Sequence, residues 1–152
     1  MGDMATTDEL ERPQTAPVEQ FYETKLFRVI LARKSLAQGH AIIERKLKDP
    51  HYYSLTLDEL EELSYLTKKV SFWSMRYTMA TGFTMMVNDG TPETMESDAL
   101  RVHIIPRPPA EVSIAPIMQE LLALATELND ADITKQVQEL QATMQLPQDN
   151  NS

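Results

Sequence analysis

Arg101 and His103 are the residues of this sequence best suited to chemistry, because of their types and their spacing of two positions. The surrounding segment 99–106, Ala-Leu-Arg-Val-His-Ile-Ile-Pro, is apolar and β-branched and predicts a strand. Side chains alternate between the two faces of a strand, so Arg101 and His103 share a face. An arginine binds phosphate or carboxylate through paired hydrogen bonds, and a histidine works as a general acid or base near neutral pH.

Asn88 is the third candidate. It opens the turn Asn88-Asp89-Gly90 that follows an apolar segment at 83–87, and hairpin-like pairing of that segment with 99–106 brings Asn88 near the strand that carries Arg101 and His103. Asn88, Arg101 and His103 therefore form the predicted ligand-binding set.

Each of these residues also has an ordinary structural explanation. Arg101 has 23 acidic side chains in the chain as candidate ion-pair partners. A histidine on a strand commonly bonds backbone or a carboxylate, and an asparagine in a turn needs no ligand. His40 is expected to make a structural hydrogen bond where a strand begins. Both interpretations of the predicted set stay open on the sequence alone.

Composition narrows the class of protein. The chain has 152 residues, no cysteine, three histidines and a net charge of −9. The missing cysteines exclude disulfides, thiolate metal sites and cysteine nucleophiles. No two histidines lie within one helical turn, so we expect no metal site and no cofactor. The acidic balance argues against a broad nucleic-acid-binding surface, which requires positive charge.

Nothing in the sequence predicts a membrane protein or a secreted one. No stretch approaches the ~20 apolar residues that span a bilayer, and the polar, acidic start lacks the apolar part of a signal peptide. We therefore expect an intracellular, cytoplasmic protein, with an organelle left open.

The elements that position the candidate residues follow an α+β order. Strands are predicted at 23–32, 40–45, 83–87 and 99–106. A long helix begins at the capping box Thr56-Leu57-Asp58-Glu59 and is expected to stop at Gly82. Two amphipathic helical segments, 115–128 and 131–144, end the chain. Strands, a helix, strands and then helices favour an α+β fold over an alternating α/β fold.

Four regions are expected along the chain. Residues 1–19 read as a disordered arm and 147–152 as a disordered tail, because both are polar and contain proline. Residues 20–110 form the main domain and 111–146 a C-terminal helical extension. The extension either packs on its own domain or docks onto a partner chain.

Four motifs in order resemble the histidine-triad (HIT) family. They are Gly39-His40-Ala41-Ile42-Ile43, the helix start at Thr56–Glu59, Asn88-Asp89-Gly90, and Val102-His103-Ile104-Ile105-Pro106-Arg107. The resemblance covers 22–107. It implies a HIT-like antiparallel sheet of about five strands crossed by the long helix, a dimer, and nucleotide binding with hydrolase or transferase activity.

The departures from the family pattern bear on activity. The family has three alternating histidines on this strand, and only the last falls on His103. The middle one, which is the nucleophile, falls on Arg101, and the first falls on Ala99. A guanidinium stays protonated and has no lone pair for attack, so Arg101 cannot replace the nucleophile. We expect no catalytic residue, and the sequence leans against an enzyme.

Three functional hypotheses follow. The first is a catalytically inactive HIT-like domain that serves as a structural or adaptor subunit, as a homodimer or within a larger complex. The second is a sensor that binds a nucleotide or phosphate at Asn88, Arg101 and His103 without turnover. The third, ranked last, is a nucleotide hydrolase with altered chemistry that uses His103 as a general base.

Overall fold

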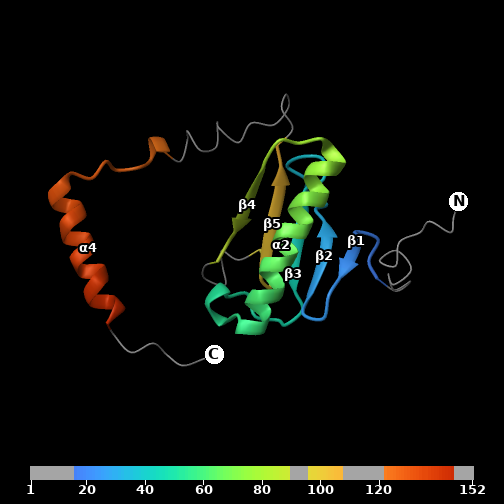
Figure 1. Cartoon of the computed structure of the whole chain (residues 1–152), viewed down its shortest axis with the longest axis horizontal. Coiled ribbons are helices and arrows are strands. Elements are labelled where there is room, and N and C mark those ends of the chain that lie inside the picture. The colour runs from blue at the N-terminus through green and yellow to red at the C-terminus, as the bar shows by residue number, and fades with distance from the viewer. Residues whose placement is uncertain (1–15, 90–95, 108–121, 146–152) are drawn as a thin grey trace, which may run out of the picture. The chain divides into compact units, whose positions relative to one another are not determined.

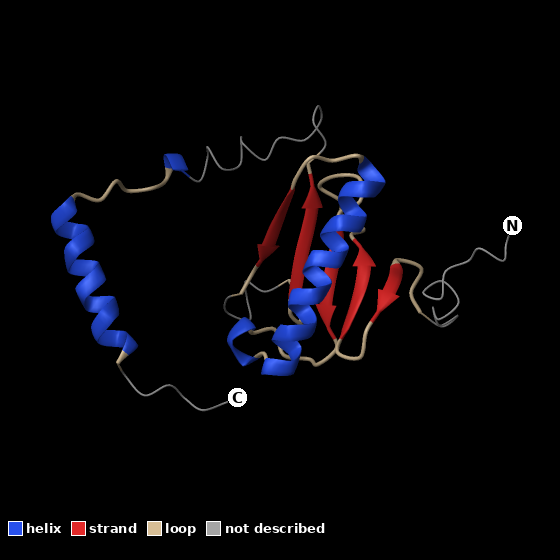
Figure 2. Ribbon diagram, in the orientation of Figure 1, coloured by secondary structure: helices blue, strands red, loops and turns tan. Residues whose placement is uncertain are grey.

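The computed structural model describes residues 16–89, 96–107 and 122–145. It divides into two compact units, 1–112 and 113–151, and each is described by itself. The first unit holds a five-stranded antiparallel sheet with one long helix, α2, against it (Figures 1 and 2). This confirms the predicted α+β fold.

The strands are β1 (Gln20–Glu23), β2 (Phe27–Leu31), β3 (Ala41–Arg45), β4 (Phe83–Val87) and β5 (Arg101–Pro106). Their spatial order is β1-β2-β3-β5-β4, so β1 and β4 are the edge strands and β5 lies inside the sheet. The register pairs Ile42 with His103 and Glu44 with Arg101 across β3 and β5. The predicted partnership of β4 and β5 is confirmed.

The predicted strand 23–32 is two strands. A tight turn separates β1 from β2: the Thr24 amide donates to the Phe27 carbonyl at 2.8 Å, and the Leu26 amide donates to Glu62 on α2. The sequence did not indicate this turn, because residues 24–26 include neither Gly nor Pro. Of the expected N-terminal arm 1–19, only 16–19 are among the described residues. The expected tail 147–152 lies outside the described residues.

Helix α2 (Leu57–Thr78) begins where the sequence predicts. Thr56 and Glu59 form a complete capping box. The predicted stop at Gly82 is wrong, because Met79 takes the left-handed conformation, φ 58°, and ends the helix earlier. Leu63, Leu66 and Val70 of the predicted stripe are buried, whereas Tyr77 near the helix end is 68% exposed.

The hydrophobic core lies between α2 and the sheet. It combines helix residues with alternate residues of β2, β3 and β5; its largest members include Phe27, Ile43, Leu66, Leu100 and Ile104. The opposite face of the central strands carries Arg28, Glu44, Arg101 and His103. Strand alternation thus separates a packed face from a polar face, as predicted for β5.

The second unit holds α4 (Asp130–Met144). Its N-cap is Asn129, whose side chain accepts from the Asp132 amide. The expected helix 115–128 is wrong at its end, because 125–128 lie outside any helix, while 115–121 are not described. In the described part of the chain, no helix is long and apolar enough to cross a membrane.

Candidate functional site

A chain of hydrogen bonds runs across the polar face from β3 to the segment before β5. His40 Nε2 lies 2.9 Å from His103 Nδ1, and His103 Nε2 lies 2.6 Å from Glu96 Oε1. Both histidines are buried, with 2% and 8% of their surfaces exposed. His40 thus makes the structural bond that the sequence predicts and also contacts the candidate residue His103.

The order of protons along this chain follows from its first bond. The Leu36 amide donates to His40 Nδ1 at 3.1 Å, so that nitrogen carries no proton. Neutral His40 therefore carries its proton on Nε2 and donates to His103 Nδ1. His103 in turn carries its proton on Nε2 and donates to Glu96. Each ring nitrogen has one role, and both rings are neutral in this arrangement.

Burial disfavours a charged His40. Burial, together with a smaller effect of the neighbouring His103, lowers the pKa of His40 from 6.5 to about 4. Protonation would place a proton on His40 Nδ1, where it would oppose the Leu36 amide. The low pKa therefore agrees with the proton order.

Arg101 lies beside a second carboxylate. Its Nε donates to Glu44 Oε2 at 2.8 Å, and its guanidinium is 3.8 Å from Glu96 Oε2. Arg28 approaches the other Glu44 oxygen at 3.7 Å. Glu44 thus stands between two arginines on neighbouring strands. Because two acidic groups face two basic groups, the cluster is close to neutral overall.

Asn88 is exposed and immediately follows β4, one step beyond the Val87–Val102 pair. This register position is level with Arg101. The next residue, Asp89, accepts from His51 Nδ1 at 3.1 Å and from the Tyr52 amide at 2.9 Å. The short helix η2 (Tyr52–Ser54) therefore anchors the turn that holds Asn88.

Sequence reasoning missed Glu44 and Glu96, which meet Arg101 and His103. Glu44 had a usable signal, since pairing of 40–45 with 99–106 brings it opposite Arg101. Glu96 had none, because it lies in an irregular segment. Within 16–89, 96–107 and 122–145, no group of three histidine or acidic side chains converges on a metal-binding geometry.

A protein-family model, the HIT domain, matches residues 14–110. The chain belongs to the HIT family. A curated relative from Arabidopsis thaliana, named a bifunctional bis(5'-adenosyl)-triphosphatase/adenylylsulfatase, is 26% identical over 91 residues, 60% of this chain. This HIT chain spans about half, 51%, of that relative's length.

Solved structures show the same HIT fold. Diadenosine triphosphate hydrolase from Plasmodium falciparum is 26% identical, with a TM-score of 0.57 over 67% of this chain and 70% of that one. A HIT family protein from Bacillus subtilis is 15% identical, with a TM-score of 0.66 over 88% of this chain and 92% of that one. The Arabidopsis and Plasmodium relatives are named as nucleotide hydrolases, and a third, from Sulfolobus tokodaii, is named a histidine triad nucleotide-binding protein.

Proposed function

We propose that this HIT domain does not catalyse nucleotidyl transfer and serves as a structural or adaptor subunit of a protein assembly. One observation carries the proposal: Arg101 stands two residues before His103, at the nucleophile position of the triad, and donates to Glu44. A permanently protonated guanidinium cannot attack phosphorus. Ala99, at the first triad position, supplies no ring nitrogen. The triad is thus degenerate at two of its three positions.

The acidic partners also disfavour an anionic substrate. A phosphate that approaches Arg101 meets the carboxylates of Glu44 and Glu96, and like charges repel in a partly buried site. His103 offers little for hydrolysis, because His40 and Glu96 occupy its two ring nitrogens. A hydrolase that uses His103 as general base would first have to break one of these bonds.

Helix α4 supports the adaptor role. Its apolar residues recur at spacings of four, three and four, which places them on one stripe. All four are exposed by 45% or more: Ile133, Val137, Leu140 and Met144. An isolated helix of 15 residues is marginally stable in water, so burial of this stripe against another chain would stabilise it.

The edge strand β4 supports a homodimer. Met85, Met86 and Val87 are exposed by 55%, 42% and 37%. An exposed apolar edge strand is a template for pairing with another strand. Beside it, Leu60 of α2 is also partly exposed and lines the same surface hollow as Met85 and Val87. We infer that two copies pair through β4 and this part of α2.

The first test measures turnover. The purified chain is incubated with diadenosine triphosphate and with adenylyl sulfate, and adenylate release is followed by chromatography. Mass spectrometry of the protein detects any adenylylated intermediate. We expect neither product above buffer, with an active HIT hydrolase as the positive control. Turnover, or an adduct on His103, would refute the catalytic part of the proposal.

The second test addresses assembly. The protein is expressed at its native level and its mass is measured before and after the substitution Leu140→Asp in the α4 stripe. We expect a species larger than a homodimer that Leu140→Asp disrupts. The matched control Gln141→Asp adds the same charge beside the stripe and should leave the assembly intact. A native protein that always runs as a free homodimer contradicts an adaptor role.

The second candidate is a nucleotide or phosphate sensor at Asn88, Arg101 and His103. The functions named for the relatives favour it. A sensor must gain thermal stability from millimolar nucleotide, since a ligand specific to the folded state stabilises that state. The gain must disappear in Arg101→Ala. A melting temperature that nucleotide leaves unchanged rejects the sensor and leaves the adaptor.

A further inference from the structure

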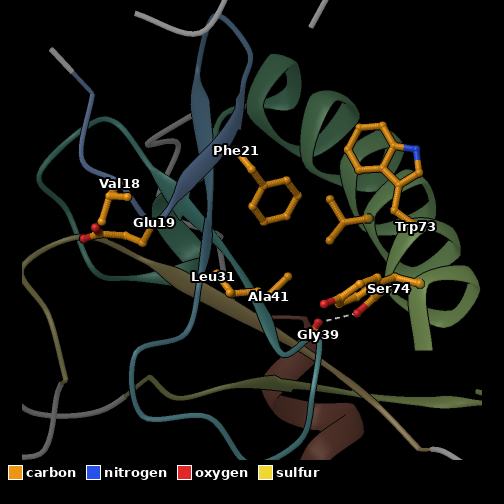
Figure 3. Close-up of a pocket in the computed structure, with 10 residues that line it drawn as sticks. Val18, Glu19, Phe21, Leu31, Gly39, Ala41, Trp73 and Ser74 are labelled. Carbon is orange, nitrogen blue, oxygen red and sulfur yellow. Dashed lines mark hydrogen bonds between the residues drawn. The ribbon is translucent and has the colours of Figure 1, made fainter. Parts of the chain in front are cut away.

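A pocket of about 350 Å³ opens between β1 and the C-terminal half of α2, on the face of the sheet that α2 covers (Figure 3). Its walls include Phe21 of β1, Leu31 of β2, and Trp73 and Tyr77 of α2, and it reaches the core at Ala41 and Val70. The polar cluster around Arg101 lies on the opposite face. The pocket is therefore separate from the triad strand's polar site, and the inference does not depend on the proposed function.

One end of the pocket is fixed by the contact between Gly39 and α2. The Ser74 hydroxyl donates to the Gly39 carbonyl, as the dashed line in Figure 3 marks. Gly39 has φ +79°, and a Cβ there would lie 2.9 Å from Thr78 Cγ2. The glycine thus lets the loop approach the helix closely. Both residues of this hydrogen bond, Gly39 and Ser74, line the pocket.

The apolar walls are partly exposed, and the Trp73 ring contacts two neighbouring side chains. Phe21 is 40% and Leu31 47% exposed. The Trp73 ring is fixed by an edge-on contact with Tyr22 at 4.9 Å, and the Lys69 ammonium lies 5.0 Å from its centroid. A preformed concave apolar surface of this size is typical of ligand sites.

Three polar side chains around the pocket are already bonded to the protein. The Ser74 hydroxyl donates to the Gly39 carbonyl, the Tyr77 hydroxyl accepts from Gln38 at 3.4 Å, and the Glu19 carboxylate accepts from Arg33 at 2.9 Å. Because the Glu19 carboxylate is already paired with Arg33, a charged ligand would lose its hydration and find no unpaired counter-charge among these three groups, which is costly. Neutral ligands pay no such cost.

We propose that this pocket binds a neutral, planar aromatic molecule of two or three rings. Three aromatic side chains, Phe21, Trp73 and Tyr77, line it, and aromatic rings pack favourably on one another in offset or edge-on geometry. A cavity of about 150 Å³ holds benzene, so a pocket more than twice as large has room for two or three rings.

The single tryptophan of the chain gives a direct measurement. Because Trp73 is the only tryptophan and lines the pocket, energy transfer from it to a bound dye reports occupancy. The probe is N-phenyl-1-naphthylamine, which is neutral and contains a naphthalene and a phenyl ring, titrated into the full chain. We expect saturable transfer with one dye per chain.

Two matched substitutions locate the site. Leu31→Glu places a carboxylate in the pocket wall. It should weaken dye binding about tenfold or more, because the bound dye would cover this carboxylate and remove its hydration. Leu47→Glu makes the same change at a residue of similar exposure, 59% against 47%, outside the pocket, and should leave binding unchanged. Tyr77→Ala, at a mostly exposed position, should also weaken binding. Thermal melts verify that each variant is folded.

Four results would overturn the proposal. They are the absence of saturable transfer, equal loss in Leu31→Glu and Leu47→Glu, tighter binding of the anionic analogue anilinonaphthalene sulfonate, and dye release as protein concentration rises. The last would mean that a second copy of the chain covers the pocket. The dye titration involves no nucleotide, so its failure would not affect the proposed function. A failure of the proposed function would likewise not affect the pocket proposal.

Discussion

At the scale of single residues, the buried His40 makes the free energy of unfolding depend on pH. The folded protein keeps His40 neutral, with its pKa lowered to about 4 from 6.5. Between these two values the unfolded chain binds a proton that the folded chain does not, so stability is full above pH 6.5 and falls as the pH drops towards 4. This loss of stability at low pH is what a histidine buried in its neutral form produces.

We predict that lowering the pH from 7.5 to 5 costs the native chain about 2 kcal/mol of unfolding free energy through His40. The carboxylates whose pKa is lowered in the folded chain, such as Glu59, reduce the unfolding free energy mainly below pH 5. Urea unfolding at the two pH values measures the loss. His40→Gln should remove most of it, whereas His51→Gln, at a half-exposed histidine, should retain it. Equal losses in His40→Gln and the native chain would contradict the assignment.

Glu44 is the residue that decides whether the polar face accepts an anion. It accepts from Arg101 and lies 3.7 Å from Arg28, so its removal leaves two guanidinium groups with less acidic charge beside them. We predict that Glu44→Gln binds adenine nucleotides more tightly than the native chain. At ten times the dissociation constant, binding is worth about 1.4 kcal/mol and raises the melting temperature by about 3 °C.

Thermal melts with and without nucleotide measure this effect. The double variant Glu44→Gln/Arg101→Ala should lose it, because the second substitution removes the guanidinium that would hold the phosphate. Glu61→Gln, which changes an exposed acid of α2 away from the polar face, serves as the control. No gain in Glu44→Gln would show that Glu44 is not what keeps anions away from Arg101.

At the scale of elements, the start of α2 is tied to β3 by a buried ion pair. Glu59 closes the capping box and also accepts two hydrogen bonds from Arg45, at 2.5 and 2.7 Å. Arg45 is 1% exposed. The same glutamate therefore fixes the first turn of the helix and compensates a fully buried charge. The pairing also lowers the pKa of Glu59, mainly through its bonds with Arg45.

We predict that Glu59→Ala destabilises the fold by about 3–5 kcal/mol, because it leaves the Arg45 guanidinium buried without its carboxylate. Thr56→Ala removes only the cap and should cost about 1 kcal/mol. Asp58→Ala, an exposed acid in the same first turn, should cost less than either. Denaturant unfolding of the three variants gives this ranking, and a Glu59→Ala cost no larger than that of Thr56→Ala would contradict it.

The elements also show what the sequence could and could not predict. Residues 83–87 and the capping box at Thr56 were predictable, since their signals are local: a short apolar segment and a four-residue motif. The turn between β1 and β2 was not, because Glu62 on a distant helix supplies one of its hydrogen bonds. In the candidate site, the shared face of Arg101 and His103 followed from alternation. Their contacts with Glu44, His40 and Glu96 depend on strand order, which no local pattern encodes.

At the scale of the whole molecule, the two edges of the sheet differ. β1 is short and irregular, with a register shift between Gln20 and Tyr22, and such irregularity discourages pairing with another chain. β4 has a regular register with β5 from Phe83 to Val87 and exposes methionines. Its outer edge is therefore the better template for a second copy, which agrees with the homodimer inferred above.

We predict that Met85→Lys converts a dimer to a monomer. Met85 is 55% exposed and shares a surface hollow with Leu60 and Val87, so a lysine there would be buried in an apolar interface without a partner. Sedimentation equilibrium over a range of concentrations measures the change, which should raise the dissociation constant by about a hundredfold or more, as expected for roughly 3 kcal/mol. Met79→Lys makes the same change at a residue that is 79% exposed and outside the hollow, and it should leave the dimer intact. If both variants remain dimers, the contact between copies lies elsewhere, and the α4 stripe becomes the surface to test.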